Sequence, residues 1–271
     1  SKKIKGGIKS APTWVDNNHI IYSKKSKPNK HGSKFFDLYS YDIKEEEEER
    51  LTEDLRLFSP IYDAENQKIY AINTYDGSCN ILMGNKDFSE FEQITDFDNG
   101  LQMFSLSIKD SLLLFDAVEN HGRNIYYYNL NNHEIGLYNS KKWDVRDPSY
   151  SNNVEINSND KFGIFNLYLK SDDGNGYITN VPGGAFMPDI SEKGEILFSL
   201  YENGGYKIAL LKTQVLLSEN NIGINNNSLR SDFSNNQYEN SDYYNRPTSN
   251  LINTGLNLEP RNYDIFSIYE N

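Results

Sequence analysis

The sequence is poor in features that several common classes of protein require. Cys79 is the only cysteine among 271 residues, which excludes an internal disulfide and a zinc site built from cysteines. No apolar run reaches the length of about 18 residues that a membrane-spanning helix needs. Lysine and arginine number 27 against 39 aspartates and glutamates, and the resulting net charge of −12 argues against a general nucleic-acid binder.

Motifs of common enzyme classes are missing as well. The chain has no Gly-x-Ser-x-Gly elbow for a serine-hydrolase nucleophile and no Gly-x-x-x-x-Gly-Lys loop for phosphates. His133-Glu134 begins like a zinc-peptidase helix motif, but Leu137 occupies the position of the required second histidine. We therefore predict no catalytic residue, no metal site and no cofactor in this segment.

The chain is rich in aromatic residues and contains a repeat. Twenty tyrosines and fourteen phenylalanines can fill a core between β-sheets. A short phrase begins at Pro12, Pro60, Pro148 and Pro188, with a degenerate copy at Phe104, so the copies recur every 40–48 residues. A period of about 40–50 residues filled with short β-type runs is typical of propeller blades of four strands each.

Each repeat has the same internal order. The phrase is followed by an apolar strand, a glycine turn such as Asp76-Gly77 or Asn203-Gly204, and an alternating strand. Aspartate-glycine and asparagine-glycine pairs favour tight hairpins because glycine adopts positive φ without a Cβ clash. Several repeats close on a fourth strand ending in threonine. The sequence therefore predicts an all-β propeller of four-stranded blades, with five blades visible as part of a six-bladed ring.

The predicted domain boundaries follow the repeat. We expect a propeller over residues 1–213 and an irregular linker or extended arm, rich in Asn, Ser and Tyr, over residues 214–271. Residues 1–10 resemble the closing strand of a preceding blade, so we expect the sequence to be an internal piece of a longer protein. The blades are predicted near residues 11–54, 55–99, 100–146, 147–186 and 187–213.

Residues 163–168, 179–188 and 199–206 resemble the TolB-like, WD40-like (PD40) propeller repeat. They are similar to the last blades of bacterial outer-membrane-associated proteins in which the propeller precedes a C-terminal surface-antigen-type barrel. The resemblance implies a periplasmic or outer-membrane-associated location in a Gram-negative-type bacterium. It also implies a monomeric module that binds a protein or peptide partner, envelope components among them.

Loops that connect successive blades carry the first candidate site residues. Arg56 and Arg146 precede blade-start prolines, and Trp143 and Asp144 stand close to the second of them. Such loops ring the mouth of the central channel, where propellers bind ligands, so we predict that these four residues line a binding funnel. In the alternative interpretation the arginines pair with carboxylates of a neighbouring blade.

Two histidines complete the predicted ligand-binding set. His31 and His121 fall in hairpins on the same face as the inter-blade loops, unless they are simply solvated turn residues. The leading prediction is a non-catalytic propeller for protein or peptide binding and scaffolding in a bacterial envelope protein. The alternatives are a propeller that gates a peptidase of the prolyl-oligopeptidase type and a polysaccharide-lyase-like propeller, for which converging histidines would hold a metal.

Charge is unevenly distributed in the first repeat. Residues 24–34 form a basic hairpin, whereas residues 45–50 contain an acidic run, and the repeat order predicts that the two lie on opposite faces. The basic hairpin is either a docking loop for an acidic partner or lipid head groups, or a solvated loop.

Overall fold

The computed structural model describes residues 7–8, 10–119, 122–139, 141–212, 215–219 and 222. The chain divides into two units, Ser1–Asn227 and Ser228–Asn271, and every described residue belongs to the first. Within the described residues, five antiparallel sheets follow one another, four with four strands and the last with three. The regular elements are all strands, which confirms the predicted all-β propeller, and no helix in this part of the chain is long and apolar enough to cross a membrane.

The strands of the first two sheets are β1 (Thr13–Trp14), β2 (His19–Lys25), β3 (Phe36–Asp42), β4 (Glu47–Arg50), β5 (Leu57–Asp63), β6 (Lys68–Tyr75), β7 (Ser78–Gly84) and β8 (Phe91–Gln93). The third sheet contains β9 (Gln102–Lys109), β10 (Leu112–Val118), β11 (Arg123–Asn129) and β12 (Ile135–Asn139). The last two contain β13 (Val145–Ser151), β14 (Val154–Asn159), β15 (Asn166–Ser171), β16 (Gly174–Tyr177), β17 (Ala185–Ile190), β18 (Ile196–Glu202) and β19 (Gly205–Leu211).

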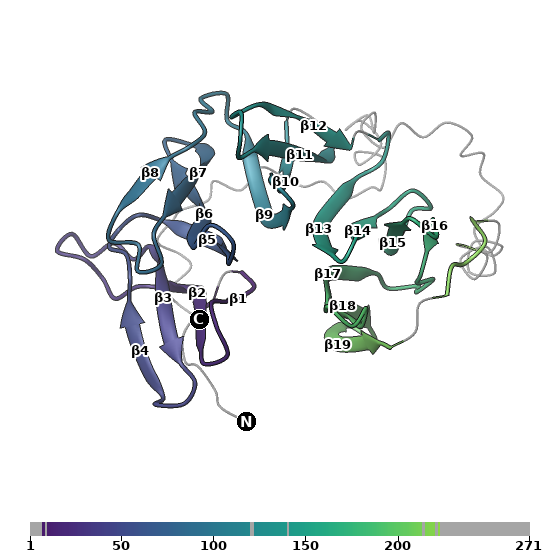
Figure 1. Ribbon diagram of the computed structural model, residues 1–271, viewed down its shortest axis with the longest axis horizontal. Helices are drawn as coiled ribbons and strands as arrows, with labels where there is room; N and C mark the ends of the chain where they lie inside the picture. The colour runs from purple at the N-terminus through teal and green to yellow at the C-terminus, as the bar shows by residue number, and fades with distance from the viewer. Residues whose placement is uncertain are drawn as a thin grey trace, which may run out of the picture. The chain divides into compact units, whose positions relative to one another are not determined.

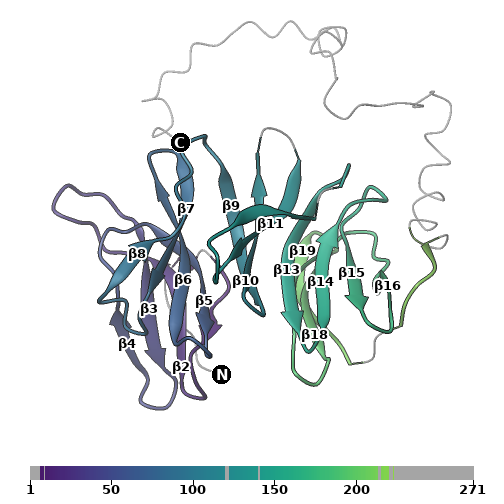
Figure 2. The ribbon, with the colours of Figure 1, turned by 45° about the horizontal axis from the view of Figure 1, so that its top comes forward.

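The first strand of each sheet lies on the inner side of the propeller. Figure 1 shows β5, β9, β13 and β17 nearest its middle, and the contacts of β9 with β5 and β13 and of β13 with β17 agree with this arrangement. Figure 2 shows β2, β3 and β4 of the first sheet side by side, in agreement with their pairing. Loops that enter the inner strands are therefore brought close together, although they are distant in sequence.

The recurring proline phrase marks a β-bulge in the inner strands β5, β13 and β17. The residue before the proline has a positive φ in each: 52° at Ser59, 55° at Asp147 and 49° at Met187. The register of the inner strand against its neighbour shifts at the same places. Proline has no N–H to donate to a neighbouring strand, so within a sheet it is accommodated at such a bulge.

The threonines that end several repeats complete the hydrogen bonding of the third strand. Each Oγ1 accepts a bond from a third-strand N–H where the fourth strand has ended: Leu38 N to Thr52 (2.9 Å), Ile81 N to Thr95 (2.8 Å) and Leu167 N to Thr179 (2.8 Å). The hydroxyl in turn bonds the polar residue preceding that N–H, Asp37, Asn80 or Asn166. These buried groups are thereby satisfied, which explains why threonine recurs there.

One prediction about the first repeat is wrong. Of residues 1–10, Gly7 and Ile8 pair with β2 of the first sheet, because Ile8 bridges Lys24 and the Lys25 N–H donates to the Gly7 carbonyl at 2.9 Å. The basic loop between β2 and β3 and the turn between β3 and β4 lie at opposite ends of β3, as the repeat order predicts. Within the strands, however, Lys24 Nζ lies 2.6 Å from Glu48 Oε2. The long lysine side chain reaches across β3 to β4, so part of the opposite charge is neutralised within the sheet.

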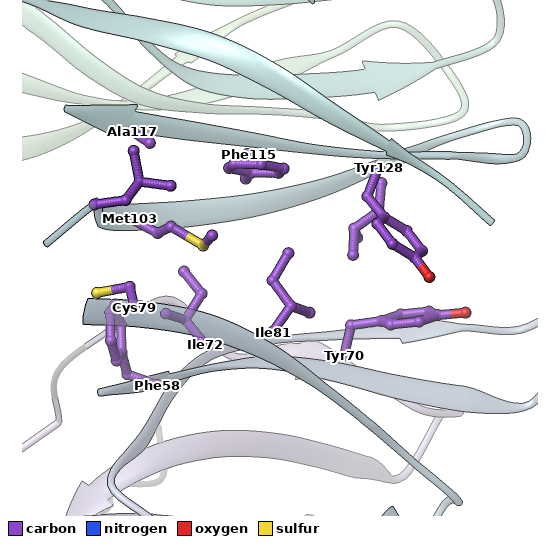
Figure 3. Packing of buried hydrophobic residues seen from close by; sticks show 11 residues of the cluster. Phe58, Tyr70, Ile72, Cys79, Ile81, Met103, Phe115, Ala117 and Tyr128 are labelled. Carbon is purple, nitrogen blue, oxygen red and sulfur yellow. The ribbon is translucent and has the colours of Figure 1, made fainter. Parts of the chain in front are cut away.

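The largest cluster of buried apolar side chains lies between the second and third sheets. Ile72 and Ile81 of the second sheet face Met103 and Phe115 of the third, and all four are at most 2% exposed (Figure 3). Cys79 is buried in the same cluster. The cysteine therefore serves as a small apolar core residue.

The neighbouring Tyr70 gives a prediction for alkaline pH. Burial, with the charge of Asp63 and the nearby Tyr128, raises the pKa of Tyr70 from 10.0 to about 12. The unfolded chain releases this proton first, so the stabilisation is complete below pH 10 and is lost as the pH rises from 10 to 12. We expect the free energy of unfolding to fall by about 1–2 kcal/mol more in the wild type than in Tyr70→Phe over this range. Urea unfolding at pH 9 and pH 12 measures the difference, and equal losses in both proteins would contradict it.

The chain after the fifth sheet returns to the fourth. The Leu217 N–H donates to the Tyr177 carbonyl at 2.7 Å, which adds a short bridge beside β16. The fifth sheet leaves one face exposed, and Tyr206 and Ile208 are 69% and 82% exposed there. That face is the one on which a following blade would pack.

Candidate functional site

Arg56 lies between two blades, immediately before β5. Its guanidinium carbon is 4.4 Å from the centroid of the Phe35 ring and 5.8 Å from that of Tyr75. Phe35 precedes β3 of the first sheet and Tyr75 ends β6 of the second. Among the described residues no carboxylate pairs with Arg56, so its N–H groups are held in place by ring stacking and remain available to an acceptor.

Arg146 has a related environment at the fourth blade. Its guanidinium carbon lies 5.2 Å from the Phe165 centroid and 5.4 Å from that of Phe186, while Nε donates to Asp147 Oδ2 at 3.1 Å. Arg146 thus combines ring stacking with a carboxylate partner, but not with the neighbouring-blade carboxylate of the alternative interpretation. The carboxylate belongs to the next residue in its own blade.

Trp143 and Asp144 point to the interface of the third and fourth sheets. Trp143 packs against the small apolar cluster that contains Leu114 and Val145. Asp144 Oδ1 accepts the Arg123 N–H at 2.9 Å, and the Asp144 N–H donates to an oxygen of Asp160 at 2.8 Å. Asp144 thus ties the β10–β11 hairpin to the fourth sheet.

The histidines do not form a described site. His31 is exposed in its turn, where its backbone N–H donates to Asn29 Oδ1 at 2.9 Å. His121 lies outside the described residues. In the part of the chain that the structure describes, no three His, Cys, Asp or Glu side chains are grouped so that they could hold a metal ion.

A buried charge network at the inner strands is not among the predicted site residues. Asp116, fully buried in β10, accepts hydrogen bonds from the Arg123 side chain and from the backbone and hydroxyl of Ser105. The Arg123 guanidinium also lies 3.6 Å from Asp147 of the fourth sheet and 4.0 Å from the Phe104 centroid. The only sequence signal is an aspartate inside the apolar run of residues 112–118.

Burial dominates the electrostatics of this network. Burial raises the pKa of Asp116. The positive charge of Arg123 acts against this increase, and the negative charge of Asp147 adds to it. Burial likewise lowers the pKa of Arg123 despite the attraction of Asp116. The network therefore holds adjacent blades together at a considerable desolvation cost.

Two inter-blade cavities open between neighbouring sheets. One, of about 540 Å³, is lined by Tyr70, Met83, Tyr128 and His133 among others, between the second and third sheets. The other, of about 580 Å³, lies between β12 and the fourth sheet, and Trp143 is part of its wall. We call the second one the blade 3–4 cavity. Both have the size of small-molecule sites.

No protein-family model matches the chain, and no curated protein matches it in sequence. Solved structures are similar in fold. TolB from Acinetobacter baumannii matches with a TM-score of 0.60 and 18% identity, over 73% of this chain and 51% of that one. A putative TolB from Agrobacterium tumefaciens matches with a TM-score of 0.62 and 13% identity, over 74% and 76%. An oligogalacturonate lyase in complex with manganese matches with a TM-score of 0.52 and 14% identity, over 78% and 65%.

The chain spans about half the length of the Acinetobacter TolB structure. All of these identities are below one fifth, so the matches establish the fold and leave activity to be argued from the residues. Because similar folds include both TolB and a lyase, the fold does not choose between binding and catalysis. The described residues form a TolB-like β-propeller.

Proposed function

We propose that this propeller is a non-catalytic module that binds a protein or peptide partner through the loops entering its inner strands. The observation that carries the proposal is Arg56, whose guanidinium is stacked on Phe35 and lacks a carboxylate partner among the described residues. Arginine and aromatic residues supply most of the binding energy in protein interfaces. A stacked guanidinium can bind a partner's carboxylate or carbonyl with little loss of side-chain freedom.

Exposed side chains on the inner strands support the same surface. Trp14 in β1, Phe104 in β9 and Met187 in β17 are 59%, 42% and 62% exposed. Each lies in or beside the recurring phrase at the start of a blade. In the proposal these groups supply apolar contact area on the same inner strands, as the core of a binding interface requires.

The setting of the module is part of the proposal. Its resemblance to outer-membrane-associated proteins favours a role in a bacterial envelope, where it acts as a monomeric unit that binds a partner or holds neighbouring domains in place. The acidic net charge of −12 disfavours nucleic acid as the partner. The peptidase-gating and lyase alternatives are not favoured by any particular contact among the described residues.

Binding of a selected peptide tests the proposed surface. A random nonapeptide library is selected on the 271-residue chain, and the dissociation constant of the enriched peptide is measured for wild type, Arg56→Ala and Arg146→Ala. We expect Arg56→Ala to weaken binding about tenfold or more, because removing a stacked arginine costs at least ~1.4 kcal/mol at an interface hot spot. Arg146→Ala should have a smaller effect, since one of its N–H groups is already bonded to Asp147.

The control is Lys44→Ala. Lys44 lies in a turn of the first sheet, and its side chain is 75% exposed. Circular dichroism and urea unfolding establish that each variant is folded. Failure of any peptide to enrich, or equal affinity of the Arg56 and Lys44 variants, would rule out this surface as the binding site.

A further inference from the structure

The wall of the blade 3–4 cavity has an unusual composition. It contains one tryptophan, three tyrosines and four asparagines, but Val145 is its only aliphatic residue. Tyr168 and Tyr177 pack edge to face with ring centroids 5.2 Å apart, and Tyr177 is only 1% exposed. The aromatic side chains are therefore held in fixed positions by the fourth sheet.

Three of the four asparagines in the wall use their amide oxygens as acceptors within the wall. Asn157, 3% exposed, accepts the Asn159 Nδ2 hydrogen bond at 3.2 Å through Oδ1, and Asn159 Oδ1 accepts the Tyr177 hydroxyl. Asn175 Oδ1 accepts the Tyr168 hydroxyl at 2.7 Å. Each oxygen is used within the wall, whereas the Nδ2 groups of Asn157 and Asn175 have no acceptor among the described residues. Both Nδ2 groups can therefore donate to a ligand that supplies an acceptor.

The carboxylates at the cavity already have partners. Glu155 Oε2 accepts hydrogen bonds from the Tyr138 hydroxyl at 2.7 Å and from Lys109 Nζ at 3.2 Å. Desolvation opposes the charge of Lys109, but the bonds to Tyr138 and Glu155 raise the pKa of Lys109 overall, so the amine stays charged. The carboxylates at the cavity are thus neutralised locally.

The cations at the cavity are only partly neutralised. Lys161 lies 2.7 Å from Glu219 and its Nζ is 5.3 Å from the Trp143 ring centroid. Lys141 and Lys170 also line the cavity, and neither has an ion-pair partner within the described part of the chain. In an acidic protein, two unpaired amines beside unpaired amide donors select an anion.

We propose that the blade 3–4 cavity binds an acidic saccharide, a pyranose ring that carries a carboxylate. The ring's C–H face packs against the aromatic side chains, while its hydroxyls and carboxylate accept bonds from the asparagine amides and from Lys141 and Lys170. A peptide would instead need apolar subsites for anchoring side chains, and the wall offers one aliphatic residue. Neither Arg56 nor Arg146 lines this cavity, so the site is separate from the proposed peptide surface.

Trp143 provides the signal for a direct test. The chain contains two tryptophans, and Trp14→Phe, in the exposed strand β1, leaves Trp143 as the only indole. This variant is titrated with a β-1,4-linked trisaccharide of glucuronic acid and, in parallel, with the glucose trisaccharide of the same linkage. We expect a saturable change in Trp143 emission with the acidic trisaccharide and at least tenfold weaker binding of the neutral one.

Substitution of the two rim lysines locates the interaction. Lys141→Gln and Lys170→Gln, both at exposed positions, should each weaken binding of the acidic trisaccharide about three- to tenfold, whereas Lys44→Gln should leave it unchanged. Absence of saturation at millimolar concentration, or equal affinity for the acidic and neutral trisaccharides, overturns the proposal. Tighter binding of hexaglutamate, weakened by the same lysine substitutions, overturns it in favour of an acidic peptide.

Discussion

Asp116→Ala should lower the free energy of unfolding by about 3–5 kcal/mol, the range measured when one partner of a buried ion pair is removed. Asp116 is fully buried and bonds the Arg123 side chain, whose exposure is 10%. After the substitution, Arg123 retains only Asp147 at 3.6 Å, and the Ser105 N–H loses its acceptor. Urea unfolding at neutral pH, followed by tryptophan fluorescence, measures the loss.

A surface ion pair and a double variant serve as comparisons. Glu202→Ala removes a pair with Lys207 in which both side chains are about half exposed, and should cost less than about 1 kcal/mol. Asp116→Leu combined with Arg123→Met should recover most of the stability, because apolar residues of similar volume avoid the desolvation cost. If Asp116→Ala costs no more than Glu202→Ala, the network does not join the third and fourth blades as the structure indicates.

Gly183→Ala should cost about 3 kcal/mol, near the upper end of the range for overpacking a well-packed site. A Cβ at Gly183 would lie 2.0 Å from the backbone oxygen of Tyr201. That oxygen belongs to β18, and the Tyr201 N–H is bonded to the carbonyl of adjacent Gly184 at 2.9 Å. This hydrogen bond joins β18 to the loop before β17, so neither can move away from the added Cβ without breaking it.

The matched control is Gly205→Ala, in β19 of the same sheet. A Cβ there meets no atom within 4 Å and the residue has no positive φ, so the change should stay within about 0.5 kcal/mol. Thermal unfolding should show a midpoint lower by about 6–12 °C for Gly183→Ala, and almost none for Gly205→Ala. Equal midpoints would show that the loop before β17 relaxes more freely than its packing indicates.

Several structural features could be predicted from local sequence. Asp76 and Gly77 both have positive φ, 52° and 84°, as a tight hairpin of that composition requires. Thr52 and Thr95 recur because one hydroxyl completes the third strand at the same place in each blade. These signals depend on neighbouring residues in one repeat, and five copies reinforce each other.

The candidate site could be predicted only in part. Arg56 and Arg146 were singled out because each precedes a blade-start proline, Pro60 or Pro148. Trp143 was expected beside them, but it packs between the third and fourth sheets and lines the cavity there. Loop position indicates the blade to which a residue belongs, whereas the direction of its side chain depends on how the next sheet packs.

By itself, the sequence determined the repeat, the four-stranded blade and the position of the inner strands, because each follows from contacts within about 45 residues. Only the tertiary structure decided which charges meet. Asp116, Arg123 and Asp147 come from three strands of two blades, and the Asn157 amide reaches the cavity wall through the packing of the fourth sheet against the third. Their proximity results from the stacking of whole sheets, whose relative rotation no single repeat encodes.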